Sequence, residues 1–88
     1  MKYRVLIESK AKKHMSKLDP FASNRIKNWI NFNLSGCTDP YIYGKALKGN
    51  LGKYWRYRVG DYRILSKIDD EKIIIAIVQV GHRKNIYN

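Results

Sequence analysis

Two alternating segments joined by only two residues constrain the fold of this chain more than any other feature. Residues Tyr54–Val59 and Tyr62–Ile68 alternate in side-chain character, and only Gly60 and Asp61 lie between them. Alternation with a period of two is typical of β-strands. A two-residue connection that begins with glycine favours a type II′ hairpin turn. The pattern therefore predicts an antiparallel hairpin whose register is set by the turn.

The predicted register brings arginines together. Neighbouring side chains on a strand point to opposite faces, so Arg56 and Arg58 share one face. The turn pairs Val59 with Tyr62, and it therefore sets Arg58 directly across from Arg63. Like charges in that arrangement destabilise a sheet, and the two strands contain no acidic residue. We interpret the arginines as a site for an external phosphate, because arginine binds phosphate through paired hydrogen bonds. The alternative is that the arginines pack on neighbouring aromatic rings through cation–π contacts.

The other segments predict a small α+β domain. Apolar residues at helical spacing follow Ser9, and Asp19-Pro20 is a typical helix start. The inner faces of the two helices are expected to carry His14 and Trp29 into the core. The expected elements are a strand at Tyr3–Ile7, a helix capped by Ser9, a helix at about Pro20–Leu34, a loop at Cys37–Asn50, the hairpin, and a final strand at Ile73–Val80. The order β-α-α-β-β-β predicts two helices packed on a mainly antiparallel sheet, and the apolar last strand suits a central position covered on both faces.

Length and cysteine content predict one cytoplasmic domain spanning residues 1–88. The single cysteine, Cys37, leaves no internal disulfide, which fits a reducing compartment. Residues Met1–Arg4 do not begin an apolar signal segment, and no stretch approaches the roughly 20 apolar residues of a membrane span. We therefore expect no membrane partner. Cys37 has no paired His or Asp in a recognisable arrangement, so we interpret it as structural or incidental.

Charge indicates the kind of partner. The chain has 18 lysines and arginines against seven acidic residues, a net charge of +11. Such a domain repels itself and favours an anionic partner: nucleic acid, an acidic protein or an anionic membrane. Lysines concentrate in residues 10–17 and arginines in residues 56–63, and seven tyrosines and two tryptophans accompany them. Aromatic rings among cations suit stacking on bases, whereas an evenly solvated basic surface is the alternative.

Three segments in order resemble the RelE/ParE toxin superfamily: Gly44–Gly49, Trp55–Ile64 and Val80–Tyr87. The superfamily contains ribosome-dependent messenger-RNA endonucleases of the RelE branch and gyrase poisons of the ParE branch. The resemblance implies that the working residues here are Arg56, Arg58, Arg63, Arg83 and Tyr87. ParE-type proteins generally lack such a complete set, so the resemblance favours the RelE branch and a RelE-like fold.

The implied reaction explains these residue types. The ribose 2′-hydroxyl attacks the adjacent phosphate, which requires a base, an acid for the leaving 5′-oxygen and positive charge at the phosphorus. We assign Arg58 and Arg63 to the scissile phosphate, Arg56 to positioning the backbone, and Arg83 to the leaving oxygen. Tyr87 is the candidate base, or a stacking partner that orients a base.

A second proton carrier stays open at this stage. The pKa of tyrosine is ordinarily near 10, so a base at Tyr87 needs the arginines to depress it. His82 is better matched to proton transfer near neutral pH and is the competing candidate. Lys45, Lys48 and Lys53 are expected to bind substrate. No metal or other cofactor is expected, because no cluster of carboxylates or Cys/His ligands is evident.

The resemblance also implies partners. An acidic antitoxin would neutralise the toxin by wrapping the domain, and operator DNA would be bound only through that antitoxin. The ribosome and messenger RNA would be the targets. Two alternatives stay open: a ParE-like gyrase inhibitor with the same fold, and a non-catalytic nucleic-acid-binding module, for which the charge alone would suffice.

Overall fold

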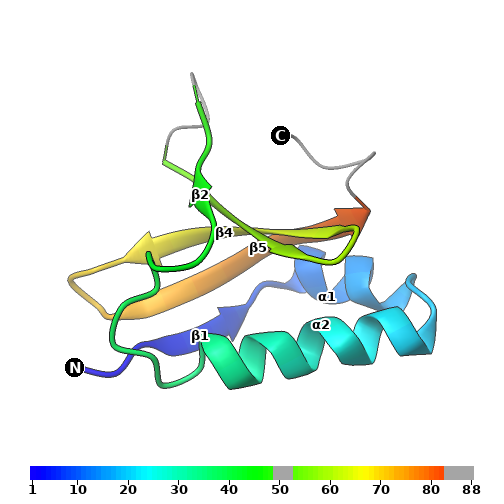
Figure 1. The fold of residues 1–88 in the computed structure, drawn as a ribbon, viewed down its shortest axis with the longest axis horizontal. Helices are drawn as coiled ribbons and strands as arrows, with labels where there is room; N and C mark the ends of the chain where they lie inside the picture. The colour runs from blue at the N-terminus through cyan, green and yellow to red at the C-terminus, as the bar shows by residue number, and fades with distance from the viewer. Residues whose placement is uncertain (49–52, 83–88) are drawn as a thin grey trace.

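The fold is two helices packed on one face of a five-stranded sheet (Figure 1). The computed structural model describes residues 1–48 and 53–82. Its elements are β1 (Arg4–Ile7), α1 (Ser9–Ser16), α2 (Pro20–Asn33), β2 (Lys45–Ala46), β3 (Trp55–Val59), β4 (Tyr62–Asp69) and β5 (Ile74–His82). The sheet order is β1-β5-β4-β3-β2, with β1 parallel to β5 and every other pair antiparallel. The predicted α+β class is confirmed.

The hairpin of β3 and β4 has the predicted register. Val59 pairs with Tyr62, and Arg58 pairs with Arg63. Gly60 has a φ of +59°, whereas Asp61 is not among the residues with positive φ. A positive φ at the first turn position alone is what a type II′ turn requires. The two-residue connection therefore sets the arginines opposite each other, as expected.

The two helices begin for different reasons. The Asp19 carboxylate accepts a hydrogen bond of 3.0 Å from the Ala22 backbone N–H, and Pro20 is the first residue of α2. This is the predicted start. At α1 the cap position is Glu8, without a side-chain cap bond, and Ser9 is already helical. The expectation that Ser9 caps α1 is therefore wrong. The Glu8 backbone N–H donates instead to the Ile77 carbonyl, so pairing with the sheet sets this turn.

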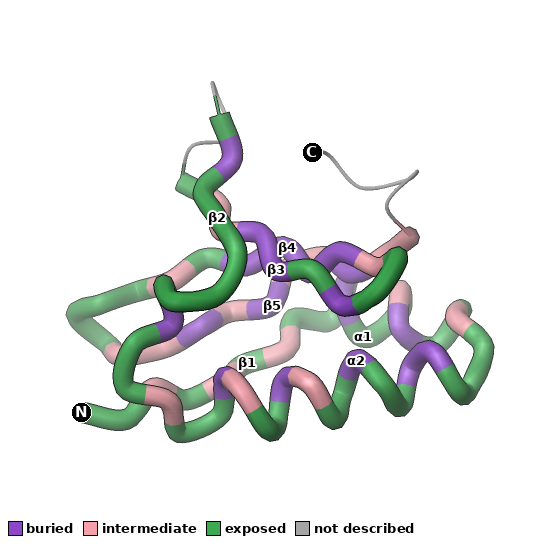
Figure 2. Tube along the Cα trace, in the orientation of Figure 1, coloured by how far each residue is buried: buried purple, intermediate pink, exposed green. Residues whose placement is uncertain are grey.

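The core lies between the helices and one face of the sheet (Figure 2). Tyr57, Ile64 and Ile77 are fully buried on the sheet, against Ile26 and Ile30 of α2. The last strand lies between β1 and β4, away from both edges. It is buried on one face only, because its alternate residues are half-exposed. The expectation of cover on both faces is therefore wrong: both helices pack on the same side.

A bulge interrupts the pairing of β4 with β5. Leu65 pairs with Gln79, but the next residue, Ser66, pairs with Ile77. Val78 is therefore the extra residue on β5. A single extra residue reverses the alternation of every side chain beyond it.

The bulge decides which face the end of β5 presents. Buried positions change from odd to even numbers, from Ile77 to Val80. His82 follows Val80 on the same side, toward the helices. The Val80 backbone N–H donates to Nδ1 of His14 on α1, at 3.3 Å. His14, predicted to be core, is half-buried and pairs with a backbone group of β5 beside the bulge.

The segment expected to be a loop contains a short strand. Lys45 and Ala46 pair with Arg56 and Trp55 of β3, so the expectation of an irregular segment throughout is wrong at β2. Gly44, with a φ of +71°, lies against the Arg56 backbone carbonyl, where a Cβ atom would collide. The close approach of two backbones at Gly44 thus allows β2 to join the sheet.

Aromatic side chains fix the rest of this segment. The Trp55 indole Nε1 donates to the Tyr43 carbonyl at 2.7 Å, and the Tyr57 hydroxyl donates to the Pro40 carbonyl at 2.8 Å. The Tyr41 hydroxyl donates to the Asp70 carboxylate at 2.9 Å. Burial and this hydrogen bond raise the pKa of Tyr41 to about 12, which keeps the donor protonated. The backbone leading into β2 is therefore anchored at three points.

Replacing Gly44 should test the close approach. We expect Gly44→Ala to lower the free energy of unfolding more than Gly36→Ala, measured by urea denaturation. Both glycines have positive φ, +71° and +77°, but a Cβ at Gly36 meets no atom within 4 Å. The left-handed backbone costs each variant about 1–2 kcal/mol. The collision should cost Gly44→Ala about 1–3 kcal/mol more.

The same variant should loosen β2. The Leu47 N–H, which bonds the Tyr54 carbonyl at 3.2 Å, should exchange with solvent faster in Gly44→Ala than in Gly36→Ala. Equal stability and equal exchange in the two variants would show that β2 does not depend on Gly44.

Candidate nucleic-acid interface

Basic side chains gather in a hollow of about 410 Å³ on the face of the sheet opposite the helices. We call it the arginine pocket. It is lined by Lys45, Ala46, Leu47, Lys48, Arg56, Arg58 and Arg63. These residues come from β2 and the two residues after it, and from both strands of the hairpin. Five of the seven carry a positive charge, and none is acidic. The pocket is thus an electropositive concavity suited to an anion.

The arginines differ in burial. Arg56 and Arg63 are only 8% and 5% exposed, whereas Arg58 lies exposed at the rim. On the same face, Arg56 has Lys45 and Leu65 as its register partners on the two flanking strands. Packing in the sheet holds the two buried side chains in place. Guanidinium groups stay charged in such surroundings, and a lower local dielectric strengthens their attraction for an anion.

Not all predicted site residues join the pocket. Lys45, Lys48, Arg56, Arg58 and Arg63 do. Lys53 does not line it, and its ammonium group lies 6.0 Å from the centre of the Tyr54 ring. Arg83 and Tyr87, the predicted groups for the leaving oxygen and for proton transfer, lie outside the described residues.

His82 lies on the other face of the sheet. It is the register partner of Tyr62, and the two rings meet edge to face with centroids 5.6 Å apart. Tyr62 shares its face with the buried Val59, whereas Arg63 points to the opposite side. The bulge at Val78 is the cause, because without it the alternation would turn His82 toward the arginines. The geometry therefore separates His82 from the arginine pocket.

Other chemical groups are simpler to place. Burial raises the pKa of the Cys37 thiol, which disfavours the reactive thiolate, in line with a structural role. Within residues 1–48 and 53–82, no group of three or more His, Cys, Asp or Glu side chains is arranged to hold a metal ion. In the same ranges no helix is long and apolar enough to cross a membrane.

Sequence reasoning missed two neighbours of the pocket. Arg25 on α2 extends to the hairpin turn, where its Nη1 lies 2.7 Å from the position that a Cβ of Gly60 would take. Trp29 packs against the core, as predicted, but it is only half-buried and also lines a hollow that includes Arg58. The spacing of α2 could reveal the exposed position of Arg25, but only the packing of α2 beside β3 brings it to the turn.

Comparisons with known proteins agree with this architecture. Residues 5–87 match the family model of the ParE toxin of the type II toxin–antitoxin system parDE. Toxin RelG of Mycobacterium tuberculosis is 33% identical over 87 residues, which cover 99% of this chain and 98% of the relative.

Solved structures agree as well. A chain in the crystal structure of the RelBE2 toxin–antitoxin complex of Mycobacterium tuberculosis matches with a TM-score of 0.85 and 31% identity, over 94% of this chain and 100% of that chain. The isolated RelE toxin of Escherichia coli matches in fold, with a TM-score of 0.72 and 22% identity over 91% of this chain and 83% of that one. The chain therefore belongs to the RelE/ParE superfamily of toxins from type II toxin–antitoxin systems.

Proposed function

We propose that this toxin is a ribosome-dependent endoribonuclease that cleaves messenger RNA and thereby inhibits translation. The observation that carries the proposal is the opposed pair Arg58 and Arg63, set with Arg56 in a pocket whose lining contains no acidic residue. Two guanidinium groups across one ladder step can hold the same phosphate from two sides. A gyrase poison that binds protein has no comparable need for three arginines in one pocket, two of them buried.

The proposed reaction uses the nucleophile of RNA itself. The ribose 2′-oxygen attacks the adjacent phosphorus, and its proton passes to a base. The bond from phosphorus to the 5′-oxygen breaks, and that oxygen receives a proton. The products are a 2′,3′-cyclic phosphate end and a 5′-hydroxyl end. The extra negative charge on the five-coordinate phosphate is the main quantity that a preorganised cationic site stabilises.

Each basic residue of the pocket has a proposed part. Arg58 and Arg63 hold the scissile phosphate and stabilise its transition state, and Arg56 positions the RNA backbone. Lys45 and Lys48, which line the same pocket, bind neighbouring phosphates. Fixed arginines match this electrostatic task because they stay protonated throughout the cycle.

The proton-transfer groups come from the C-terminal segment in this proposal. Tyr87 acts as the base, or orients one by stacking, and Arg83 stabilises the leaving oxygen. His82 is a weaker candidate for proton transfer, because its ring packs on Tyr62 on the face opposite Arg63. The positive pocket would lower the pKa of a tyrosine brought beside it, which favours the base.

The proposed partners follow from charge and family. A net charge of +11 suits an acidic antitoxin that folds over the toxin, and the solved relative from Mycobacterium tuberculosis is itself a toxin–antitoxin complex. Operator DNA would then be reached only through the antitoxin. The ribosome and its message are the proposed targets, which places the activity in the cytoplasm.

The function is tested in a translating extract. Added protein should cut messages at ribosome-occupied codons and leave 2′,3′-cyclic phosphate ends, detected by mapping of RNA ends. A parallel assay of gyrase supercoiling should be unaffected. Intact message with blocked supercoiling would instead assign the protein to the gyrase-inhibitor branch. If the protein retains RNA without cutting it, and supercoiling is normal, the protein would be a non-catalytic RNA-binding module.

Variants test the assigned residues. Arg63→Ala should lose most cleavage because the phosphate loses a buried cation, whereas Lys72→Ala removes an exposed charge in the β4–β5 turn and should cleave normally. Tyr87→Ala should also lose cleavage. Tyr87→Phe separates the two roles proposed for Tyr87. If the hydroxyl is the base, the variant should lose cleavage; if the ring only stacks, the variant should retain it. Full cleavage by Arg63→Ala, or loss in His82→Gln with the fold intact, would contradict the assignment.

The opposed arginines should carry a measurable cost in stability. We expect Arg58→Gln to raise the free energy of unfolding by roughly 0.2–1 kcal/mol at low salt, because like charges directly opposite destabilise a sheet. The gain should shrink in 1 M salt, where the Debye length is about 3 Å. Arg4→Gln is the matched control, since Arg4 is an exposed strand arginine that pairs with Ile74. No difference between the two variants would mean that the opposition is not destabilising.

A further inference from the structure

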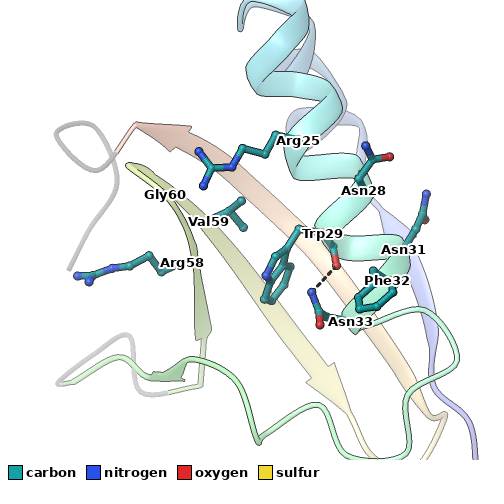
Figure 3. A pocket seen from close by; sticks show the side chains of 9 residues that line it. All are labelled: Arg25, Asn28, Trp29, Asn31, Phe32, Asn33, Arg58, Val59 and Gly60. Carbon is teal, nitrogen blue, oxygen red and sulfur yellow. Dashed lines mark hydrogen bonds between the residues drawn. The ribbon is translucent and has the colours of Figure 1, made fainter.

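A second hollow lies beside the arginine pocket, between α2 and the end of β3 (Figure 3). Its volume is about 720 Å³, within the range of pockets that accept small organic ligands. Its lining includes Arg25, Asn28, Trp29, Phe32, Arg58 and Gly60. We call it the helix groove. Both of its charged lining residues are arginines, and none of the lining residues is acidic.

The helix groove is connected to the arginine pocket. An intermediate hollow of about 470 Å³ shares Trp29 and Arg58 with the helix groove, and it shares Lys45, Arg56 and Arg58 with the arginine pocket. Arg58 lines all three hollows, and it lies on the part of β3 that β2 does not pair with, since β2 pairs only with Trp55 and Arg56. An extended anionic chain can therefore pass from one hollow to the next around this edge.

The hairpin turn gives Arg25 its place in the groove. Its guanidinium lies over Gly60, with Nη1 2.7 Å from the position of a Cβ at that residue. Figure 3 shows Arg25 extending from α2 toward Gly60, while Arg58 leaves β3 on the side away from α2. The two guanidinium groups thus flank the end of β3, one toward each face. Consecutive phosphates that cross the edge would meet a cation on both sides.

Aromatic and amide groups from α2 line the rest of the helix groove. The Trp29 indole is held against the rings of Tyr43 and Tyr57, with centroids 5.7 and 5.4 Å away, yet stays half-exposed. The Phe32 ring is 90% exposed at the other side of the groove. Such rings can stack on bases, and the Asn28 amide can bond to base edges. The Asn33 amide is engaged with the Trp29 carbonyl at 3.1 Å.

We propose that the helix groove is a second RNA subsite, which holds nucleotides flanking the scissile phosphate through Arg25 and Trp29. This inference rests on the proposed ribonuclease function, because it treats the arginine pocket as the place of cleavage. Continuity of the hollows and the arginines Arg25 and Arg58 beside the end of β3 favour single-stranded RNA. An acidic peptide that docks on the exposed Phe32 ring is the competing occupant, and the test includes it.

Binding of uncleavable RNA tests the subsite directly. Fluorescent 2′-O-methyl oligonucleotides of three and nine nucleotides, with the same central sequence, are titrated by anisotropy with the intact chain. The wild type should bind the longer RNA more tightly. Arg25→Gln should weaken binding of the nine-nucleotide RNA by about tenfold, the effect of one charge-assisted contact, and leave three-nucleotide binding within about twofold.

Lys27→Gln is the matched control. It removes one exposed cation from the same helix, and Lys27 does not line the helix groove. The variant should bind both RNAs nearly as the wild type does, and thermal melting of both variants should match the wild type. A similar modest loss in both variants would mean that Arg25 contributes only general charge, and the proposal would be wrong.

The remaining outcomes separate the subsite from the proposed function. A wild type that gains nothing from the added nucleotides would overturn the subsite, whether or not it cuts message in the extract. If message is not cleaved but the tighter binding of the longer RNA depends on Arg25, the proposed ribonuclease function would be wrong. The groove would then bind RNA without flanking a scissile phosphate. An unchanged length effect in Arg25→Gln, with weaker capture of a synthetic Glu- and Leu-rich helical peptide, would assign the groove to a protein partner.

Discussion

The two-residue turn at Gly60 and Asp61 is the constraint on which the rest of the structure depends. Because the turn fixes the register, one face of β3 packs in the core and the other face carries the arginines. Tyr57 and Val59 are buried against the helices, while Arg56 and Arg58 stand on the opposite face with Arg63. If the pairing register shifted by one residue, the two faces of the strand would exchange. Arginines would then be buried in the core, and the ring of Tyr57 would be exposed. The register that stabilises the domain is therefore also the one that assembles the candidate site, and neither can be altered independently.

Features set by local chemistry could be predicted from the sequence. The hairpin register follows from a glycine in a two-residue connection, and the start of α2 follows from Asp19 and Pro20. The opposed arginines follow in turn from the register, so the centre of the candidate site could be predicted together with the fold. Lys45 and Lys48 are predicted substrate-binding residues, and the anchoring of their segment by Trp55 and Tyr57 explains how they reach the pocket.

Features that depend on distant partners could not be predicted in this way. The bulge at Val78 has no glycine or proline to mark it, yet it turns His82 away from the arginines. The strand at Lys45–Ala46 is too short for any periodicity, and it exists because Gly44 lets two backbones approach. The position of Arg25 beside Gly60 depends on how α2 crosses the sheet. In each case the deciding contact joins residues far apart in the chain, so no local pattern carries the information.

The charge of the pocket links stability to binding. Cations held close together raise the energy of the free protein, and any anion that binds among them lowers it by mass action. In the proposed reaction, a phosphate near Arg58 and Arg63 would relieve the repulsion most when its own negative charge is greatest, which is in the five-coordinate state rather than in the bound substrate. Preorganised charge of this kind favours the transition state over the ground state, because its cost is met during folding and not during the reaction. The same argument applies to carboxylates on a protein partner: an acidic segment laid across these arginines would stabilise the toxin and occupy the proposed phosphate site in a single step.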